Sequence, residues 1–360
     1  MRRVSDERGV VAVVVALVTL VMMGMAALAI DVGMLYQEKR ELQNGADAGA
    51  LAVAEDCARG VITCSVGAAQ AVAQGYADLN ANDLQSDAVV DTTDFDPNGR
   101  ASVIATTRDA ATSEPYLTLL FARVFGVDTA TVDARATAIW GSPSSLGSFP
   151  LIVSTCEYDQ LTVGGTAFAE APYDDGAPAG EAESELVFHD GNPTGGCAAQ
   201  AGHDLDGDGA LPGGFGWLVS DGYCRVVTTT IDGQDWVSKD SGNNRSGGCD
   251  AAPLAAIVGT VVAVPVFEDF CRPAHDASCP TYDNKDKYRV ARYAAFYVSG
   301  FDLGGPAFHK SDGVYRTSTP TCGTNSQDDF CITGFFTTEV ISAGDLGGPA
   351  GSVIVIKMAQ

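Results

Sequence analysis

The sequence predicts an α+β protein. An N-terminal transmembrane helix extends into a small α+β unit, and a β-rich, sandwich-like domain follows. Three observations lead to this expectation. Residues 10–30 form an apolar run without a charged side chain. Up to residue 140, helix-like and strand-like patterns are mixed. Beyond residue 150, β-prone runs alternate with turn-rich loops, and no long helical pattern interrupts them.

Size and charge narrow the class of protein. The chain has 360 residues, of which 46% are hydrophobic, so it is long enough for about two domains with buried cores. Its 46 Asp and Glu outnumber its 21 Lys and Arg, which gives a formal net charge of -25. Nucleic-acid binders need a basic face that neutralises phosphates. The composition therefore argues against a nucleic-acid partner.

The apolar run has the length of a membrane span. Its 21 residues, Val10 to Ile30, would extend about 32 Å as a helix, close to the hydrocarbon thickness of a bilayer. Arg2, Arg3 and Arg8 precede it and Asp31 follows it. By the positive-inside rule, residues 1–9 should be cytoplasmic and the body extracytoplasmic. The expected location is thus the cell membrane, with a single pass.

A cleaved secretory signal is the alternative interpretation. Ala27–Ala29 has the small-x-small spacing that signal peptidase recognises, so cleavage would follow Ala29. However, the apolar run is longer than a usual signal core. The helical pattern also continues past the cut to about Cys57, and no proline occurs before Pro97. These features favour a retained anchor.

Small residues dominate the helix after the span, in Asn44–Ala50. They would let a second helix approach closely. That helix could belong to the same domain, which we favour, or to a partner protein.

Three segments carry a resemblance to a known family. They are Arg8-Gly9-Val10, Ala29-Ile30-Asp31-Val32-Gly33 and the stretch Leu42-Gln43-Asn44-Gly45-Ala46-Asp47-Ala48-Gly49-Ala50-Leu51-Ala52. Over residues 8–54 the chain resembles TadE/TadG-like Flp (tight-adherence) pilus-assembly proteins. The resemblance implies a membrane-anchored, pilin-like component or accessory of a bacterial pilus. It also implies that other pilus-assembly proteins are partners, contacted through the N-terminal helix.

Two departures from that family's patterns bear on processing and metal binding. Prepilin-type cleavage would follow Gly9 and prefers Glu at the fifth mature position, where this chain has Val14. A retained anchor is therefore favoured. Some TadG-like proteins carry an Asp-x-Ser-x-Ser metal motif, and this sequence contains none.

Residues 31–140 are expected to form the small, pilin-like α+β unit. The helical pattern of Val66–Leu79 places Ala69, Val72, Ala73, Tyr76 and Leu79 on one face. Pro115 precedes a second expected helix, Tyr116–Phe125. The expected strands are Ala88–Asp94, Ala101–Thr107 and Thr129–Ile139.

A linker is expected at residues 141–150, which are poor in charge and rich in Gly, Ser and Pro. The β-rich extracytoplasmic domain would then occupy residues 151–360. Its expected strands are Leu151–Thr155, Leu186–His189, Trp217–Ser220, Arg225–Ile231, Ile257–Phe267, Tyr288–Phe301, Ile332–Ile341 and Ser352–Lys357.

All ten cysteines follow the span. Three pairs are close in sequence and suited to local disulfides: Cys57 with Cys64, Cys271 with Cys279, and Cys322 with Cys331. Cys156, Cys197, Cys224 and Cys249 remain, and they allow three pairings. Zinc is less favoured because it prefers Cys-x-x-Cys pairs, which the chain lacks. The cysteines indicate an oxidising compartment.

One loop resembles the start of a calcium site. Asp204, Asp206 and Asp208 alternate and are followed by glycine, as in an EF-hand loop. Position twelve of such a loop would be Phe215, which offers no carboxylate. Calcium is thus the one cofactor that the sequence suggests, and an acidic surface turn is the alternative interpretation.

No motif indicates catalysis. The chain has no Gly-x-Ser-x-Gly nucleophile elbow, no His-Glu-x-x-His zinc helix and no phosphate-binding glycine loop. We therefore expect a structural protein rather than an enzyme. Two other hypotheses stay open: a calcium-assisted surface adhesin, and a secreted hydrolase released after Ala29.

Overall fold

The structure, a computed structural model, describes most of the chain. The described residues are 8–109, 112–173, 183–187, 215–231, 233–240, 246–274, 279–302, 307–309, 331–341 and 344–359. The chain divides into two compact units, Met1–Ile139 with Lys357–Gln360, and Trp140–Ile356. The fold is α+β, as the sequence predicts, with a long apolar helix ahead of a strand-rich part.

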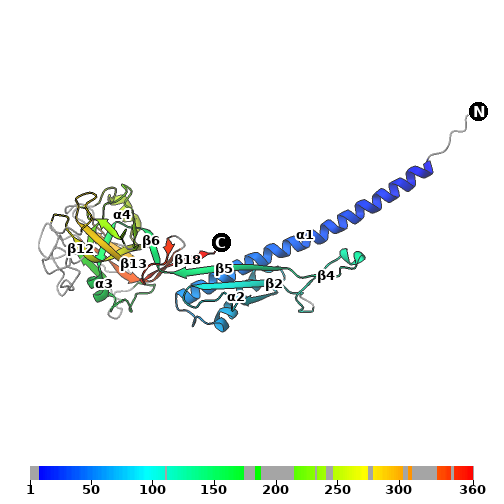
Figure 1. Ribbon diagram of the computed structural model, residues 1–360, viewed down its shortest axis with the longest axis horizontal. Helices are drawn as coiled ribbons and strands as arrows, with labels where there is room; N and C mark the ends of the chain where they lie inside the picture. The colour runs from blue at the N-terminus through cyan, green and yellow to red at the C-terminus, as the bar shows by residue number, and fades with distance from the viewer. Residues whose placement is uncertain are drawn as a thin grey trace, which may run out of the picture. The chain divides into compact units, whose positions relative to one another are not determined.

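The first helix, α1, spans Arg8–Ala58 without interruption (Figure 1). This confirms the expected continuation of the apolar run to about Cys57. The helix ends where Gly60 adopts a φ of 68°, a left-handed conformation that glycine reaches without strain, and its N–H donates to the Cys57 carbonyl. The Cys57–Cys64 disulfide then closes the turn into the second helix.

Helix α2, Val66–Asn80, confirms the predicted helix and begins at Ser65, whose hydroxyl accepts a hydrogen bond from the Ala68 N–H. The predicted buried face is wrong in part. Ala69 and Ala73 are buried, but Tyr76 and Leu79 are exposed, and Ala77 is buried instead. The reason is close contact with α1, which selects the alanine stripe of α2 rather than its larger side chains.

Three antiparallel strands complete the first unit: β1 (Ser86–Val90), β2 (Arg100–Thr107) and β5 (Asp133–Gly141), in the order β1-β2-β5. Helix α1 packs against β2, and α2 packs against β1. Because the buried residues are mainly alanine and valine, the helices lie close to the sheet. These elements match the predicted small α+β unit.

The segment between β2 and β5 differs from expectation. The predicted helix Tyr116–Phe125 is largely wrong: β3 (Leu117–Thr118) pairs with β4 (Thr129–Ala130), and only Ala122–Phe125 forms a 3₁₀ turn, η1. Gly126, with a φ of 83°, ends that turn. A hairpin thus replaces the helix, because strand pairing and a long-range contact with α1 outweigh local helical preference.

The second unit contains two sheets and two short helices, α3 (Thr155–Leu161) and α4 (Ala251–Ile257). The larger sheet curls into a half-barrel. Its strand order is β8 (Ser184–Val187), β15 (Cys331–Thr337), β13 (Lys287–Asp302), β12 (Val261–Cys271), β7 (Leu151–Ser154) and β9 (Phe215–Trp217), while β11 (Trp236–Ser238) and β14 (Ala307–His309) also pair with β13. The smaller sheet has the order β10 (Val226–Thr229), β6 (Pro143–Ser148) and β17 (Asp345–Leu346). A parallel pair joins β16 (Glu339–Ile341) to β18 (Val353–Met358).

Each predicted strand of this region overlaps an observed one, but several boundaries differ, those of β8 and β9 among them. Residues 143–148, within the expected linker, form β6. Residues 251–257 form α4, so the strand predicted at Ile257–Phe267 begins only at Val261. The strand predicted at Ile332–Ile341 is divided into β15 and β16.

The long strands bury both faces. On β13, Ala294, Phe296 and Val298 belong to one core cluster, while Tyr293 and Ala295 belong to another. This alternation follows from the two-residue period of a strand. The first cluster also includes α3 and α4 residues, and the second includes Leu146 of β6 and Val226 of β10. The second cluster therefore packs the smaller sheet against the larger one, which gives the sandwich-like character.

Three disulfides are described. Cys57–Cys64 and Cys271–Cys279 confirm two predicted local pairs. The Cys224–Cys249 bond belongs to one of the three pairings that the sequence left open for four cysteines. Cys156 and Cys331 are also disulfide-bonded, and their partners lie outside the described residues. The Cys322–Cys331 pair therefore stays a prediction.

We predict that Phe336→Ala destabilises the second unit by about 3–5 kcal/mol, since it removes a buried ring and leaves a cavity. Phe336 is 1% exposed and packs edge-on against Tyr158 and Phe296. Denaturant unfolding followed by the intrinsic tryptophan fluorescence, to which the buried Trp217 contributes, measures the effect. Val227→Ala is the control: its side chain is 76% exposed, and we expect a change within about 0.5 kcal/mol. Equal effects of the two substitutions would contradict the core assignment.

Candidate functional site: the long helix and its membrane-proximal contacts

The N-terminal half of α1 packs against nothing in the described chain. Its large side chains from Val11 to Ile30 are exposed. The most apolar 18-residue window has a mean hydropathy of 2.7, and none of it is buried. By length and composition this helix can cross a membrane, and no other helix among the described residues meets that test. Such exposure is costly in water and favourable in lipid.

The C-terminal half of α1 is covered by its own unit. Leu42, Ala46, Ala50 and Val53 are buried. Gly45 and Gly49 lie so close to α2 that added Cβ atoms would stand 3.2 Å from the Ala77 Cα and 3.3 Å from the Ala73 carbonyl oxygen. The Ala/Gly stretch therefore packs within the unit, which is the alternative that the sequence favoured.

Asp31 stands at the junction of these two halves and is 2% exposed. Its carboxylate accepts hydrogen bonds from three successive backbone N–H groups at the end of the β3–β4 hairpin. Leu120 N lies 3.0 Å from Oδ1, Phe121 N lies 3.0 Å from Oδ2, and Ala122 N lies 2.6 Å from Oδ2. One side chain of α1 thus satisfies the donors at the start of η1, which have no partner within that turn.

The charged form of Asp31 is favoured. Burial alone would raise its pKa, but the N–H donors of Ala122, Phe121 and Leu120, with Arg123 nearby, hold the pKa below its usual range. Asp31 is therefore ionised at neutral pH, when its hydrogen bonds to the hairpin are strongest.

Side chains of α1 that lie C-terminal to Asp31 make further polar contacts with the first unit. Glu38 Oε1 accepts from the Thr107 hydroxyl at 2.5 Å, and Lys39 donates to the Asp133 carbonyl. Gln43 Nε2 donates to the Arg135 carbonyl at 3.3 Å. The helix is thus tied at successive levels to β2, to β5 and to the hairpin.

The predicted calcium ligands cannot be placed. Asp204, Asp206 and Asp208 lie outside the described residues, so the calcium hypothesis stays a prediction. Within the described ranges, no cluster of three or more His, Cys, Asp or Glu side chains has the geometry to hold a metal.

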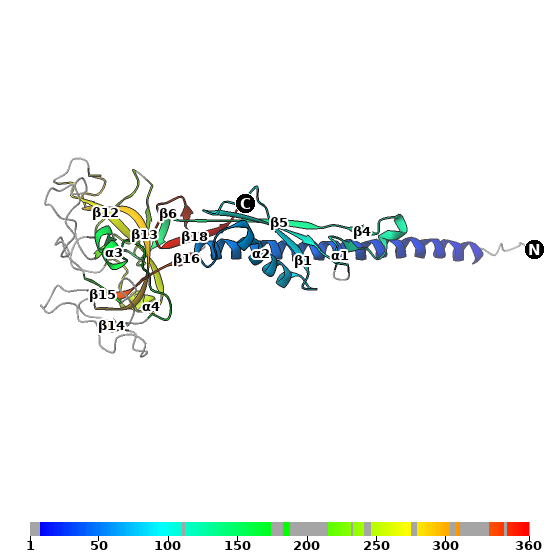
Figure 2. The same ribbon diagram turned by 90° about the horizontal axis from the view of Figure 1, so that it is seen from below.

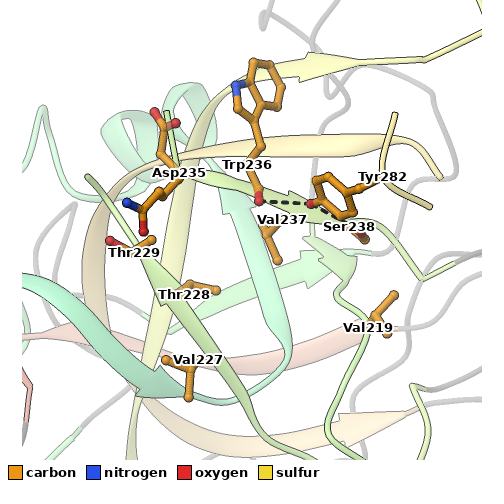
Figure 3. Close-up of a pocket in the computed structure, with 10 residues that line it drawn as sticks. Val219, Val227, Thr228, Thr229, Asp235, Trp236, Val237, Ser238 and Tyr282 are labelled. Atoms are coloured by element: carbon orange, nitrogen blue, oxygen red, sulfur yellow. Dashed lines mark hydrogen bonds between the residues drawn. The ribbon is translucent and has the colours of Figure 1, made fainter. Parts of the chain in front are cut away.

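Two hollows are lined by described residues of the second unit. One, of about 220 Å³, lies beside β10 and β11 and is shown in Figure 3. There the Tyr282 hydroxyl donates to the Trp236 carbonyl at 3.2 Å. The other, of about 590 Å³, is mainly apolar and is lined by Phe149, Val226 and Ile257 among others. The contacts described in these hollows are structural hydrogen bonds and apolar packing.

From the sequence, Asp31 was expected only to follow the span as a flanking negative charge. Its role as hydrogen-bond acceptor was missed, because its partners lie 89 to 91 residues away. The available signal was an acidic residue directly after an apolar run, which indicates a boundary but not a contact.

Comparison with known proteins finds one family model that matches the start of the chain. The TadE/G-like Flp pilus-assembly family model matches residues 9–56, which include the apolar half of α1, Asp31 and most of the Ala/Gly-rich half. No curated protein and no solved structure matches the chain. The family match, the apolar helix and the disulfides fit a membrane-anchored pilus component.

We predict that Asp31→Ala releases the hairpin from α1, because three N–H groups lose their acceptor. Hydrogen exchange of the Leu120, Phe121 and Ala122 amides should become faster while exchange in α2 is unchanged. Glu55→Ala is the control, since Glu55 makes an exposed pair with Arg59 that contributes little.

The depressed pKa of Asp31 gives a second expectation for the same amides. A carboxyl whose folded pKa is lowered stabilises the fold above its ordinary value of 3.8 and loses that effect as the pH falls through the folded pKa. Slow exchange should therefore persist at pH 3.8 in the parent protein. Loss of protection above that pH would contradict the assignment.

We predict that Gly49→Leu destabilises the α1–α2 pair by about 1–3 kcal/mol, since the new side chain would overlap Ala73. Gly75→Leu is a matched control, because a Cβ there meets nothing within 4 Å, and we expect no loss of stability. Hydrogen exchange of the α2 amides in detergent micelles measures both. A neutral Gly49→Leu would show that the helices do not approach as described.

Proposed function

We propose that this protein is a membrane-anchored, pilin-like component or accessory of a bacterial Flp (tight-adherence) pilus, with a structural role. The observation that supports this most strongly is the coincidence of the family match, residues 9–56, with α1. Within that single helix, an apolar half suited to lipid continues into a half that folds with the first unit.

The proposed orientation places residues 1–9 in the cytoplasm and the body outside the membrane. Arg2, Arg3 and Arg8 before the span favour this direction. The disulfides support it as well, because bonds such as Cys57–Cys64 and Cys224–Cys249 persist in oxidising compartments.

Contacts with other pilus-assembly proteins would use the apolar half of α1. The Ala/Gly face at residues 44–50 is occupied by α2 and is not available for lateral packing. The exposed half, from Val11 to Ile30, is the part of the helix left to contact lipid and neighbouring spans.

We predict that the mature protein is recovered in the membrane fraction with an N-terminus at Met1 or its immediate neighbours. Protease added to spheroplasts should digest the body and leave the anchor in the membrane. A mature chain that begins at Ile30 in the soluble fraction would contradict the anchor, and one that begins at Val10 would indicate prepilin-type processing. Replacing Arg2, Arg3 and Arg8 by Gln tests the orientation, since protection of the body should then increase.

A further inference from the structure

Exposed apolar side chains gather at the end of the β3–β4 hairpin. We call residues 120–127 the hairpin tip. Val124 is 82% exposed and Phe125 is 69% exposed. Leu120, Phe121 and Val127 are exposed beside them. Monomeric proteins seldom leave so many large apolar side chains together in water, which indicates that another apolar phase covers the tip.

The tip is a folded element that presents these side chains outward. Leu119, directly before it, is 3% exposed, and its N–H donates to the Asp128 carbonyl at 2.9 Å. Inside the tip, η1 closes on Gly126, whose N–H donates to the Arg123 carbonyl at 3.0 Å. The backbone donors at the start of η1 are taken up by Asp31. These backbone donors are therefore satisfied, while the large apolar side chains stay exposed.

The contacts of α1 show which way the hairpin extends. Three hydrogen bonds follow one another toward the N-terminus of α1. Gln43 donates to the Arg135 carbonyl, Lys39 donates to the Asp133 carbonyl, and Asp31 accepts from the hairpin tip. The hairpin thus runs along α1 toward its apolar half, and Figure 2 shows β4 beside α1 on the N-terminal side of β1.

The level of the tip follows from this arrangement. Asp31 comes directly after Ile30, the last residue of the apolar run. One residue of helix rises 1.5 Å, so Asp31 stands at the edge of the hydrocarbon if α1 spans the bilayer. A tip bonded to Asp31 is then level with the headgroups.

We propose that the hairpin tip inserts into the surface of the bilayer that α1 crosses. Val124 and Phe125 would enter the boundary between headgroups and acyl chains, as apolar residues of interfacial segments do. Arg123, which is exposed and whose Nε donates to the Leu119 carbonyl at 3.2 Å, would meet lipid phosphates with its remaining donors, in a chain that is otherwise strongly acidic. The inference rests on the proposed anchor. It adds a second contact that fixes the tilt and rotation of the folded unit on the membrane.

Tryptophan quenching by brominated lipid tests the inference on the full chain. Phe125→Trp is incorporated into phosphatidylcholine–phosphatidylglycerol vesicles with or without bromine on the acyl chains, and the emission of the parent protein, with its three native tryptophans, is subtracted. We expect the added tryptophan to lose most of its emission in brominated vesicles. Val124→Trp should behave in the same way, which guards against a local defect at Phe125.

Two reference variants give each outcome a meaning. Val61→Trp has comparable exposure, 67%, but lies at the turn after the far end of α1, and its emission should not change. Leu20→Trp lies within the span and should be quenched. If Leu20→Trp is quenched and both tip variants are not, the insertion is refuted while the anchor stands. If Leu20→Trp is also unquenched, the anchor itself fails. Tip emission that is unquenched and blue-shifts as protein density in the vesicle rises would show that a second copy covers the tip, which also overturns the proposal.

Discussion

A single buried carboxylate couples the apolar part of α1 to the folded part of the first unit. Asp31 accepts the N–H groups of Leu120, Phe121 and Ala122, which lie at the start of a short turn with no internal acceptors for them. At the membrane surface proposed for the hairpin tip, where water is scarce, unpaired backbone donors are costly. The Asp31 carboxylate therefore accepts the hydrogen bonds that water would accept elsewhere. It allows the hairpin to lie beside α1 directly after the apolar run ends.

Helix α1 serves two environments, and its sequence changes where the environment changes. Its N-terminal half has large apolar side chains on all sides, as lipid requires. Its C-terminal half has glycine and alanine at the contact with α2, where Gly45 and Gly49 permit close approach. Because the helix is continuous from Arg8 to Ala58, a tilt of the span is transmitted to the unit packed on it. This continuity suits a protein that must hold a folded body at a defined height above a membrane.

Hydrophobic periodicity and turn-forming residues in the sequence predicted much of the fold. The continuous helix, α2, and many of the strands of both units followed from patterns local to each segment, and two local disulfides followed from cysteine spacing. Non-local choices were beyond that reasoning. The buried face of α2 depends on which side meets α1, so Tyr76 and Leu79 were misplaced. The hairpin at Leu117–Ala130 depends on pairing and on Asp31, far away in the chain, and local preference suggested a helix instead.

The central proposal is that α1 leaves the bilayer at Asp31 on the extracytoplasmic side. A cysteine-accessibility scan in spheroplasts tests it most directly, since none of the described native cysteines is free. The account predicts that Val21→Cys stays unlabelled by a membrane-impermeant maleimide, whereas Val32→Cys and Tyr36→Cys, exposed in the structure, are labelled. Equal labelling of all three, or labelling of Val32→Cys and Tyr36→Cys only after the membrane is opened, would contradict it.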